Sequence, residues 1–256
     1  MALDLAAIKA KLNQLNKQDD KRQNLWKPES GKTRIRVVPY VHRKDNPFLE
    51  LYFHYDIAKR SMLSPVSFGN ADPIVEFAEK LKKTGDKDEW LMGRKIEPKM
   101  RTYVPVIVRG KESEGVKFWG FGKQIYTELL SIVSDPDYGD ITDLMNGRDI
   151  DVEFTPAEGA NFPKTNIRVK PNTQPATEDK AIAEKIMNQP LITDIFPEPT
   201  YEELEKCLQD WMNPENADSD TSDSSDSAAP EKEETSKPAI AGKVEDVASA
   251  FNDLFN

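Results

Sequence analysis

Cysteine, histidine and long apolar runs are scarce in this chain of 256 residues. It contains one cysteine, Cys207, and two histidines, His42 and His54. An internal disulfide framework and a metal cluster held by several cysteines are therefore excluded. No apolar run approaches the ~20 residues that a membrane-spanning helix needs, and no apolar segment of a signal peptide follows Met1. We expect a protein without a membrane segment that works in a reducing, cytoplasmic setting.

The charge is divided unevenly along the chain. Residues 1–125 hold 25 Lys and Arg against 16 Asp and Glu, a balance of +9, whereas residues 126–256 hold 10 against 29, a balance of −19. Together they give the net charge of −10. This asymmetry indicates a half that binds a polyanion, joined to an acidic segment. The low overall isoelectric point therefore does not exclude a nucleic-acid ligand.

The middle of the chain, residues 24–212, combines strand-like and helix-like patterns. Helices are expected from Pro73, with Asp72 as N-cap, and over residues 124–133, 178–188 and 199–212. Runs of alternating or β-branched residues predict strands over 33–40, 48–57, 101–109, 116–121, 149–155 and 165–170. Because the order has no βαβ rhythm, we expect an α+β or mainly β fold, an OB-fold (a Greek-key barrel) with inserted helices.

The two ends of the chain differ from this core. Residues 3–16 have the apolar spacing of a short amphipathic helix, which is too short to be stable without a partner surface. It belongs to an arm over residues 1–23, and packing on its own domain is an equally weighted alternative. Residues 213–239 contain no aromatic or large aliphatic residue, so we expect a disordered acidic tail over 213–256. An apolar stripe near its end predicts a short docking helix; the alternative is a tail that only confers solubility.

Enzyme motifs are weak. Ser30-Gly31-Lys32-Thr33 lacks the earlier glycine of a phosphate-binding loop, because Trp26 stands there. Cys207 is distant in sequence from both histidines, and it lies on the apolar side of an expected helix. Asp151 and Glu153 faintly resemble the two carboxylates that bind the metal ion of a nuclease, but the sequence shows no third ligand for such an ion. We therefore predict no catalysis, and keep a metal-dependent nuclease as a minor alternative.

Basic and aromatic residues interleave on the expected strands. Single-stranded nucleic acid is held by cations that contact phosphates and by aromatic rings that stack on bases. Strand alternation places Arg34 with Arg36 on one face. The same rule groups Lys99, Arg101 and Tyr103, and also Lys117, Trp119, Phe121 and Lys123. A binding groove is the favoured interpretation. The alternative is that Trp119 and Phe121 face the core.

Several short blocks resemble one family of proteins. They are Leu5-Ala6-Ala7, Ala10-Lys11-Leu12-Asn13, Trp26-Lys27, Ile35-Arg36-Val37-Val38-Pro39, Lys99-Met100-Arg101-Thr102-Tyr103, Phe121-Gly122-Lys123 with Ile125-Tyr126, and Glu158-Gly159-Ala160-Asn161-Phe162. In this order, and with the acidic tail, they resemble the single-stranded DNA-binding, helix-destabilising proteins of T-even-like tailed phages. The likeness covers most of the chain.

This resemblance implies an OB-fold that coats single-stranded DNA cooperatively and without catalysis, in the cytoplasm of the infected host cell. It implies that the arm contacts neighbouring protomers and that the tail recruits replication, recombination and repair proteins. The groove candidates that carry over are Arg36, Lys99, Arg101, Tyr103, Trp119, Phe121, Lys123 and Phe162, and strand alternation adds Arg34, Tyr52 and Lys117. The self-association candidates are Leu5, Ile8, Lys9, Lys11 and Leu12, and the partner-docking candidates are Val247, Phe251, Leu254 and Phe255.

The chain departs from the family in one respect that concerns a metal. Members of the family bind a structural zinc ion through one histidine and three cysteines. His54 matches the histidine, but no cysteine follows it in this region. We therefore predict no zinc and no other cofactor. An OB module that binds RNA or protein remains the main alternative to DNA binding, because a stacking groove fits RNA equally well.

Overall fold

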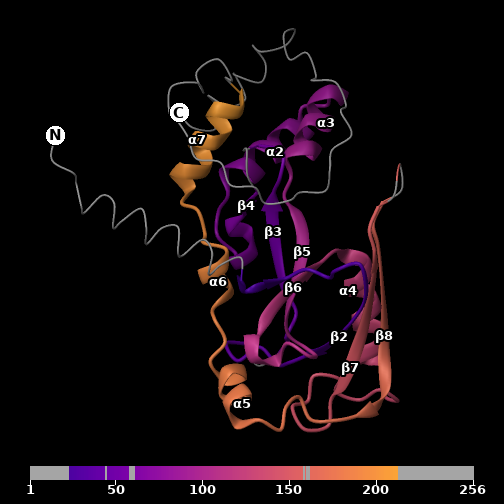
Figure 1. Cartoon of the computed structure of the whole chain (residues 1–256). Helices are drawn as coiled ribbons and strands as arrows, with labels where there is room; N and C mark the ends of the chain where they lie inside the picture. The colour runs from indigo at the N-terminus through magenta and orange to yellow at the C-terminus, as the bar shows by residue number, and fades with distance from the viewer. Residues whose placement is uncertain (1–22, 44, 58–60, 158, 160–161, 213–256) are drawn as a thin grey trace, which may run out of the picture. The chain divides into compact units, whose positions relative to one another are not determined.

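The computed structural model describes residues 23–43, 45–57, 61–157, 159 and 162–212. Within these residues the chain forms six α-helices and a sheet of eight strands (Figure 1). An α+β class is therefore confirmed. Contacts divide the chain into two units, each made of two separate segments. The sheet unit comprises Met1–Leu51 and Met100–Pro197, and the helical unit comprises Tyr52–Lys99 and Glu198–Asn256.

Six of the strands lie side by side across the sheet. Their order is β1 (Leu25–Trp26), β6 (Lys117–Phe121), β5 (Lys99–Val108), β2 (Gly31–Val37), β7 (Arg148–Thr155) and β8 (Lys164–Thr173). β1 is parallel to β6, and the other neighbours are antiparallel. Among the described strands, β1 and β8 are the ends of this path and do not pair, so the sheet is not closed into a barrel. The OB-fold stays a prediction.

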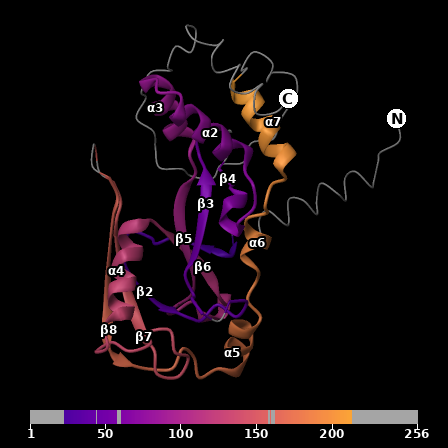
Figure 2. The ribbon, with the colours of Figure 1, turned by 180° about the vertical axis from the view of Figure 1, so that it is seen from behind.

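The two faces of this sheet carry different cores. The larger core contains Ile35 of β2 and Ile150 of β7, and α4 (Lys123–Ser134) adds Leu129 to it. Figures 1 and 2 show α4 beside β7 and β8 from both sides. The other face has a smaller core, in which Ile107 of β5 packs with Ile186 of α5 (Lys180–Met187). The 3-10 helix η2 (Glu112–Glu114) and the short helix α6 (Ile192–Ile195) also belong to the sheet unit.

The helical unit is built from α2 (Pro73–Lys83), α3 (Lys87–Ile96) and α7 (Tyr201–Met212). It also contains the end of β3 (Leu49–His54), its partner β4 (Met62–Leu63) and the 3-10 helix η1 (Pro65–Phe68). As predicted, α2 begins at Pro73, and the Asp72 carboxylate accepts hydrogen bonds from the first free backbone N–H groups. Leu204 and Leu208 of α7 complete a core around Phe77 of α2.

The patterns located most elements correctly. The expected helices correspond to α2, α4, α5 and α7, and the six expected strands correspond to β2, β3, β5, β6, β7 and β8. α3 was not expected, because its apolar residues Trp90, Leu91 and Met92 are consecutive instead of recurring at helical spacing. Within the described residues, no helix combines the length and the apolar character that crossing a bilayer requires.

Candidate nucleic-acid interface

Two of the aromatic residues expected in a groove lie in the core of the sheet unit. Trp119 and Phe121 are 1% and 4% exposed. Their ring centroids are 4.7 Å apart, and the ring of Trp119 is 5.6 Å from that of Trp26. They share one face of β6, as alternation predicted, but that face is the one buried in the larger core with Leu129 of α4. The prediction that these rings face a ligand is wrong, and the alternative that they are core residues is confirmed.

Arg36 is also buried, with no exposed surface. Its Nε donates a hydrogen bond to Asp149 Oδ1 at 2.8 Å, and its Nη2 donates to the carbonyl of Gln174. Arg109 donates to the same carboxylate through Nε at 3.0 Å and Nη2 at 2.9 Å. Phosphate cannot reach a guanidinium enclosed in this way, so the prediction of Arg36 as a groove residue is wrong. Its role is to hold β2 and β7 together.

The pKa of Asp149 reflects this environment. Burial alone would raise it, but hydrogen bonds from Arg109 and Arg36 outweigh burial and hold the pKa below its usual range. The side-chain amide of Gln174 donates a further hydrogen bond to Asp149 Oδ2. The carboxylate therefore stays charged between the buried guanidinium group of Arg36 and the half-buried one of Arg109.

Tyr103 lies on the opposite face of the sheet from Trp119 and is 8% exposed. Its ring covers Gly120 on the neighbouring strand, where an added Cβ would come 2.6 Å from Tyr103 Cε1. The ring of Phe196 packs against it at a centroid distance of 4.9 Å. Tyr103 therefore offers little surface for stacking, and glycine at position 120 makes this packing possible.

Four predicted residues of the sheet unit are exposed: Arg34, Arg101, Lys123 and Phe162. Arg101 Nη2 donates to the carbonyl of Gly120 at 3.1 Å, and Lys123 begins α4. The other predicted cation of this unit, Lys117, is half-buried and forms an ion pair with Glu114. Contact of these residues with DNA stays a prediction.

β2, β7 and β8 present a polar face on the side of the sheet away from the larger core. Cross-strand partners on antiparallel strands point to the same side, so Arg34, Asp151 and Arg168 form one row across the three strands. We call this surface the hairpin cationic face; its members are Lys32, Arg34, Lys164, Arg168 and Lys170, with the carboxylates of Asp151 and Glu153. Five positive charges against two negative ones leave a balance of +3.

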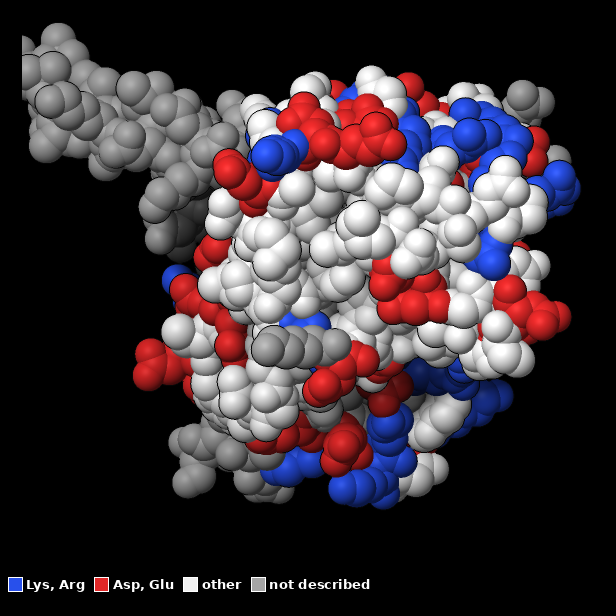
Figure 3. All heavy atoms as spheres, turned by 90° about the horizontal axis from the view of Figure 1, so that it is seen from below, with Lys and Arg blue, Asp and Glu red and all other residues white. Residues whose placement is uncertain are grey.

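Of these five cations, only Arg34 was predicted from the sequence as a groove residue. Arg168 and Lys170 alternate on the expected last strand, and Lys164 continues this alternation just before it. That pattern was the signal that would have revealed three of the other four cations. On the side of the molecule drawn in Figure 3, Lys and Arg occur in separate groups between acidic side chains. Such local grouping is what the sequence balance of +9 cannot show.

Asp151 organises this face. Its side chain is 2% exposed, and its carboxylate lies 2.9 Å from Lys32 Nζ, 2.9 Å from Arg34 Nε and 2.7 Å from Lys170 Nζ. Burial would raise the pKa of Asp151, but the bonds from Lys170, Lys32 and Arg34 hold it far below its usual range. Hydrogen bonding to Asp151 likewise raises the pKa of Arg34. One anion therefore orients three cations and leaves a surplus of positive charge.

Phe162 lies in the connection between β7 and β8 and is 85% exposed. Pro163 separates it from β8, which carries Lys164 and Arg168 on one face. A large ring held in water next to cations is suited to stacking on a base. Phe162 is the only predicted aromatic residue of the sheet unit that the structure leaves open in this way, within the part of that unit that the structure describes.

Two further groove candidates lie in the helical unit. Lys99 is exposed, and its Nζ is 3.3 Å from the carboxylate of Asp56. Tyr52 is half-buried, and its backbone N–H donates to Ser67 Oγ at 2.8 Å. Neither contact indicates whether the residue binds a nucleic acid, so the roles of Lys99 and Tyr52 in binding DNA stay predictions.

The histidine that resembles a zinc ligand lies in a network without cysteine. His54 Nε2 is 2.9 Å from Asp72 Oδ2, and its Nδ1 is 3.0 Å from the carbonyl of Ile96. Ser64 Oγ donates to the same oxygen of Asp72. Structural zinc takes four ligands, usually Cys and His, with deprotonated donor atoms. Among the described residues no three His, Cys, Asp or Glu side chains are grouped to hold a metal, so this site does not fit zinc.

The same network contains the residue types of a hydrolase triad but not its geometry. Ser64 donates to Asp72, whereas a triad requires the serine to donate to the histidine. All three side chains are buried, with Ser64 at 0% and His54 at 1% exposure, so no substrate reaches them. The nuclease alternative is weakened in a similar way, because Asp151 is occupied by three cations.

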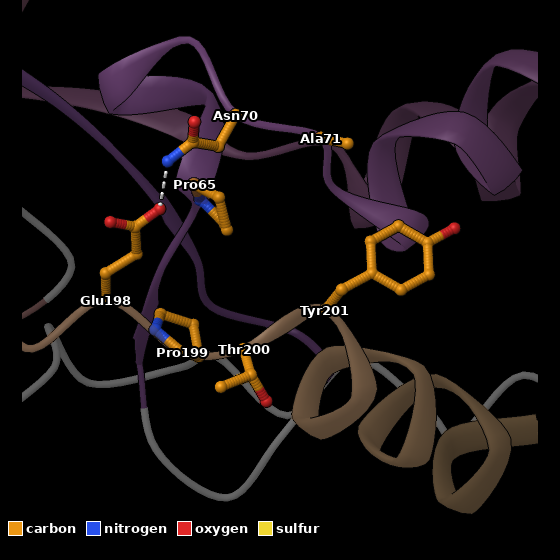
Figure 4. Close-up of a pocket in the computed structure, with 7 residues that line it drawn as sticks. All are labelled: Pro65, Asn70, Ala71, Glu198, Pro199, Thr200 and Tyr201. Atoms are coloured by element: carbon orange, nitrogen blue, oxygen red, sulfur yellow. Dashed lines mark hydrogen bonds between the residues drawn. The ribbon is translucent and has the colours of Figure 1, made fainter.

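One open pocket lies in the helical unit, with a volume of about 460 Å³ (Figure 4). Pro65 and Pro199 line it, and Asn70 Nδ2 donates to Glu198 Oε1 at 2.7 Å at its border. The Tyr201 hydroxyl donates to Glu76 at 3.1 Å; burial and this bond raise the pKa of Tyr201 to about 12. Tyr201 therefore keeps its proton near neutral pH.

The remaining sequence predictions lie outside the described residues. They are the self-association candidates Leu5, Ile8, Lys9, Lys11 and Leu12, and the partner-docking candidates Val247, Phe251, Leu254 and Phe255. Self-association and partner docking therefore stay predictions.

A comparison with protein families gives a match to this chain. A protein-family model described as "gp32 DNA binding protein like" matches residues 29–213. This range includes the hairpin cationic face, Phe162 and the His54 network. Among curated proteins, no match to the chain is found.

Proposed function

Because the chain belongs to the gp32-like family of DNA-binding proteins, we propose that it coats single-stranded DNA without regard to sequence, using the hairpin cationic face and Phe162. The observation that supports these residues is the grouping of five cations on one face beside a ring that is 85% exposed. Cations that follow the phosphates and rings that stack on bases are together sufficient for such binding.

In this proposal Asp151 prepares the surface before DNA arrives. It holds Lys32, Arg34 and Lys170 in fixed positions, so less side-chain entropy is lost when a phosphate binds. Each phosphate that a cation neutralises releases counterions, which drives binding at low salt. Because phosphates carry no sequence information, this contact does not discriminate between bases.

The remaining roles that the resemblance implies are part of the same proposal. An OB-fold would provide the scaffold, the arm over residues 1–23 would contact neighbouring protomers, and the acidic tail over 213–256 would recruit replication, recombination and repair proteins. No catalytic step is required of the protein. The buried positions of Ser64, His54 and Asp72 support a role without catalysis.

Fluorescence anisotropy with end-labelled oligonucleotides tests this function. Oligo(dT), oligo(U) and a duplex of equal length would each be titrated with the full chain at several salt concentrations. We expect tight binding of oligo(dT) and weak binding of the duplex. The logarithm of the affinity should fall with the logarithm of the salt concentration, with a slope of about −3.5 if all five cations contact phosphates. Stronger binding of the duplex would contradict the proposal, and a clear preference for oligo(U) would favour the RNA alternative.

Substitution of Phe162 by alanine should weaken binding of oligo(dT) about fivefold and leave the salt slope unchanged. Stacking on a base contributes ~1–3 kcal/mol, and ordering a loop side chain costs part of this, so we expect a net loss of about 1 kcal/mol. Phe162→Trp should retain the affinity because it keeps a ring. An equal loss in both variants would show that stacking by this residue does not contribute.

A further inference from the structure

The His54 network has a protonation state that its partners define. The carbonyl of Ile96 has no proton to give, so His54 Nδ1 must donate to it. At Nε2 the partner is Asp72 Oδ2, which also accepts from Ser64. The other oxygen of Asp72 accepts from the backbone N–H groups of Ile74 and Val75, at 2.9 and 3.3 Å. Both oxygens of Asp72 therefore face hydrogen-bond donors, which is the setting that the carboxylate partner of a protonated histidine requires.

The pair of His54 and Asp72 joins four parts of the helical unit at one point. His54 ends β3, Ser64 follows β4, Asp72 is the N-cap of α2, and Ile96 is the last residue of α3. The side chains of His54 and Asp72 are both 0% exposed. Each polar atom of the network therefore has its partner inside the protein, as a buried ion pair requires.

We infer that the His54 imidazolium and the Asp72 carboxylate form the cross-link that holds the helical unit together, so that this unit folds without a metal ion. A metal would need a deprotonated nitrogen of His54, and both are engaged as donors. The lone cysteine offers no replacement ligand, because Cys207 Sγ lies 3.7 Å from Met62 Sδ within the apolar core of the unit. The inference does not depend on DNA binding.

Nitrogen NMR of His54 tests the protonation state directly. In ¹⁵N–¹H spectra of the full chain near neutral pH, both imidazole nitrogens of His54 should appear protonated. His42, whose Nε2 lies 2.8 Å from the carbonyl of Gln189, is the other histidine of the chain and serves as internal comparison. An unprotonated nitrogen on His54 would overturn the inference.

Metal analysis tests the second part. The full chain, expressed in medium supplemented with zinc, should contain far less than one zinc ion per chain by mass spectrometry. Its melting temperature should be unchanged by a chelator. About one zinc ion per chain, together with a lower melting temperature in chelator, would show that a metal and not the ion pair holds this unit.

A matched pair of substitutions tests the cross-link. Asp72 and Asp86 are both N-cap residues of the helical unit, on α2 and α3. Asparagine caps a helix as well as aspartate, so Asp86→Asn should change the melting temperature by no more than about 2 °C. Asp72→Asn also removes the anion beside His54 and should lower the melting temperature by at least about 5 °C. If Asp72→Asn does not fold, Ser64→Ala, which removes one donor to Asp72, should give a smaller decrease in the melting temperature. Equal decreases for Asp72→Asn and Asp86→Asn would overturn the inference. So would an unchanged melting temperature in Ser64→Ala.

Discussion

Replacement of Asp149 by asparagine is expected to lower the free energy of unfolding by about 3–5 kcal/mol. The variant keeps the shape of the side chain but removes the negative charge between Arg36 and Arg109. Arg36 has no exposed surface, so water cannot compensate for the lost partner. Urea or thermal unfolding of the full chain measures the effect. A loss below about 1 kcal/mol would mean that the backbone carbonyls bonded to these arginines are sufficient on their own.

The same substitution should change the pH dependence of stability. The folded-state pKa of Asp149 lies below its unfolded value, because the bonds from Arg109 and Arg36 outweigh burial. Its stabilisation is therefore present at neutral pH and is lost as the pH falls through the folded-state pKa. The difference in the free energy of unfolding between wild type and Asp149→Asn should therefore decrease below about pH 4. Glu153→Gln, an exposed change on the same strand, should stay within about 0.5 kcal/mol of wild type throughout.

Neutralising two cations of β8 should have the largest effect on DNA binding. Lys164 and Arg168 are exposed members of the hairpin cationic face, so the double variant Lys164→Gln, Arg168→Gln should fold normally. If each contacts one phosphate, the salt slope becomes less steep by about 1.4. Affinity for oligo(dT) then falls about 60-fold at 50 mM salt and about tenfold at 200 mM. Anisotropy titration across this range measures both quantities.

The control for this prediction changes the same number of charges on other elements of the sheet unit. Lys111 follows β5, and Lys180 is the first residue of α5. Lys111→Gln, Lys180→Gln should reduce affinity only slightly, through long-range electrostatics that salt screens. Equal losses in the two double variants would show that net charge, and not the hairpin cationic face, determines binding.

The elements of the fold were largely predictable from the sequence, because periodicity and capping are local. Asp72 followed by Pro73 gives both the start of α2 and its first hydrogen bonds. Alternation likewise placed Trp119 and Phe121 on one face of β6. It did not show which face α4 covers, because that depends on residues distant in the sequence. The two rings were therefore assigned to the surface although they lie in the core.

The candidate site was less predictable for a related reason. Arg34 and Arg36 are two residues apart, so alternation places both on the same face of β2. Nevertheless Arg34 is exposed and Arg36 is buried. The difference comes from β7, where Asp149 pairs with Arg36 and Asp151 with Arg34. Arg109 and the segment around Gln174 enclose the first pair only. Pairing between strands far apart in the chain is the information that one sequence read along its length does not contain.

The interleaved order of the two units also has a consequence for how the chain folds during synthesis. The first segment of the helical unit is made before most of the sheet unit, but its core lacks Leu204 and Leu208 until α7 has been made. The ribosome therefore releases much of the sheet unit while Phe77 and Ile74 still lack part of their apolar covering. Contacts between such distant segments form slowly. A nascent chain stopped before residue 201 should accordingly be more sensitive to protease within residues 73–96 than the finished protein.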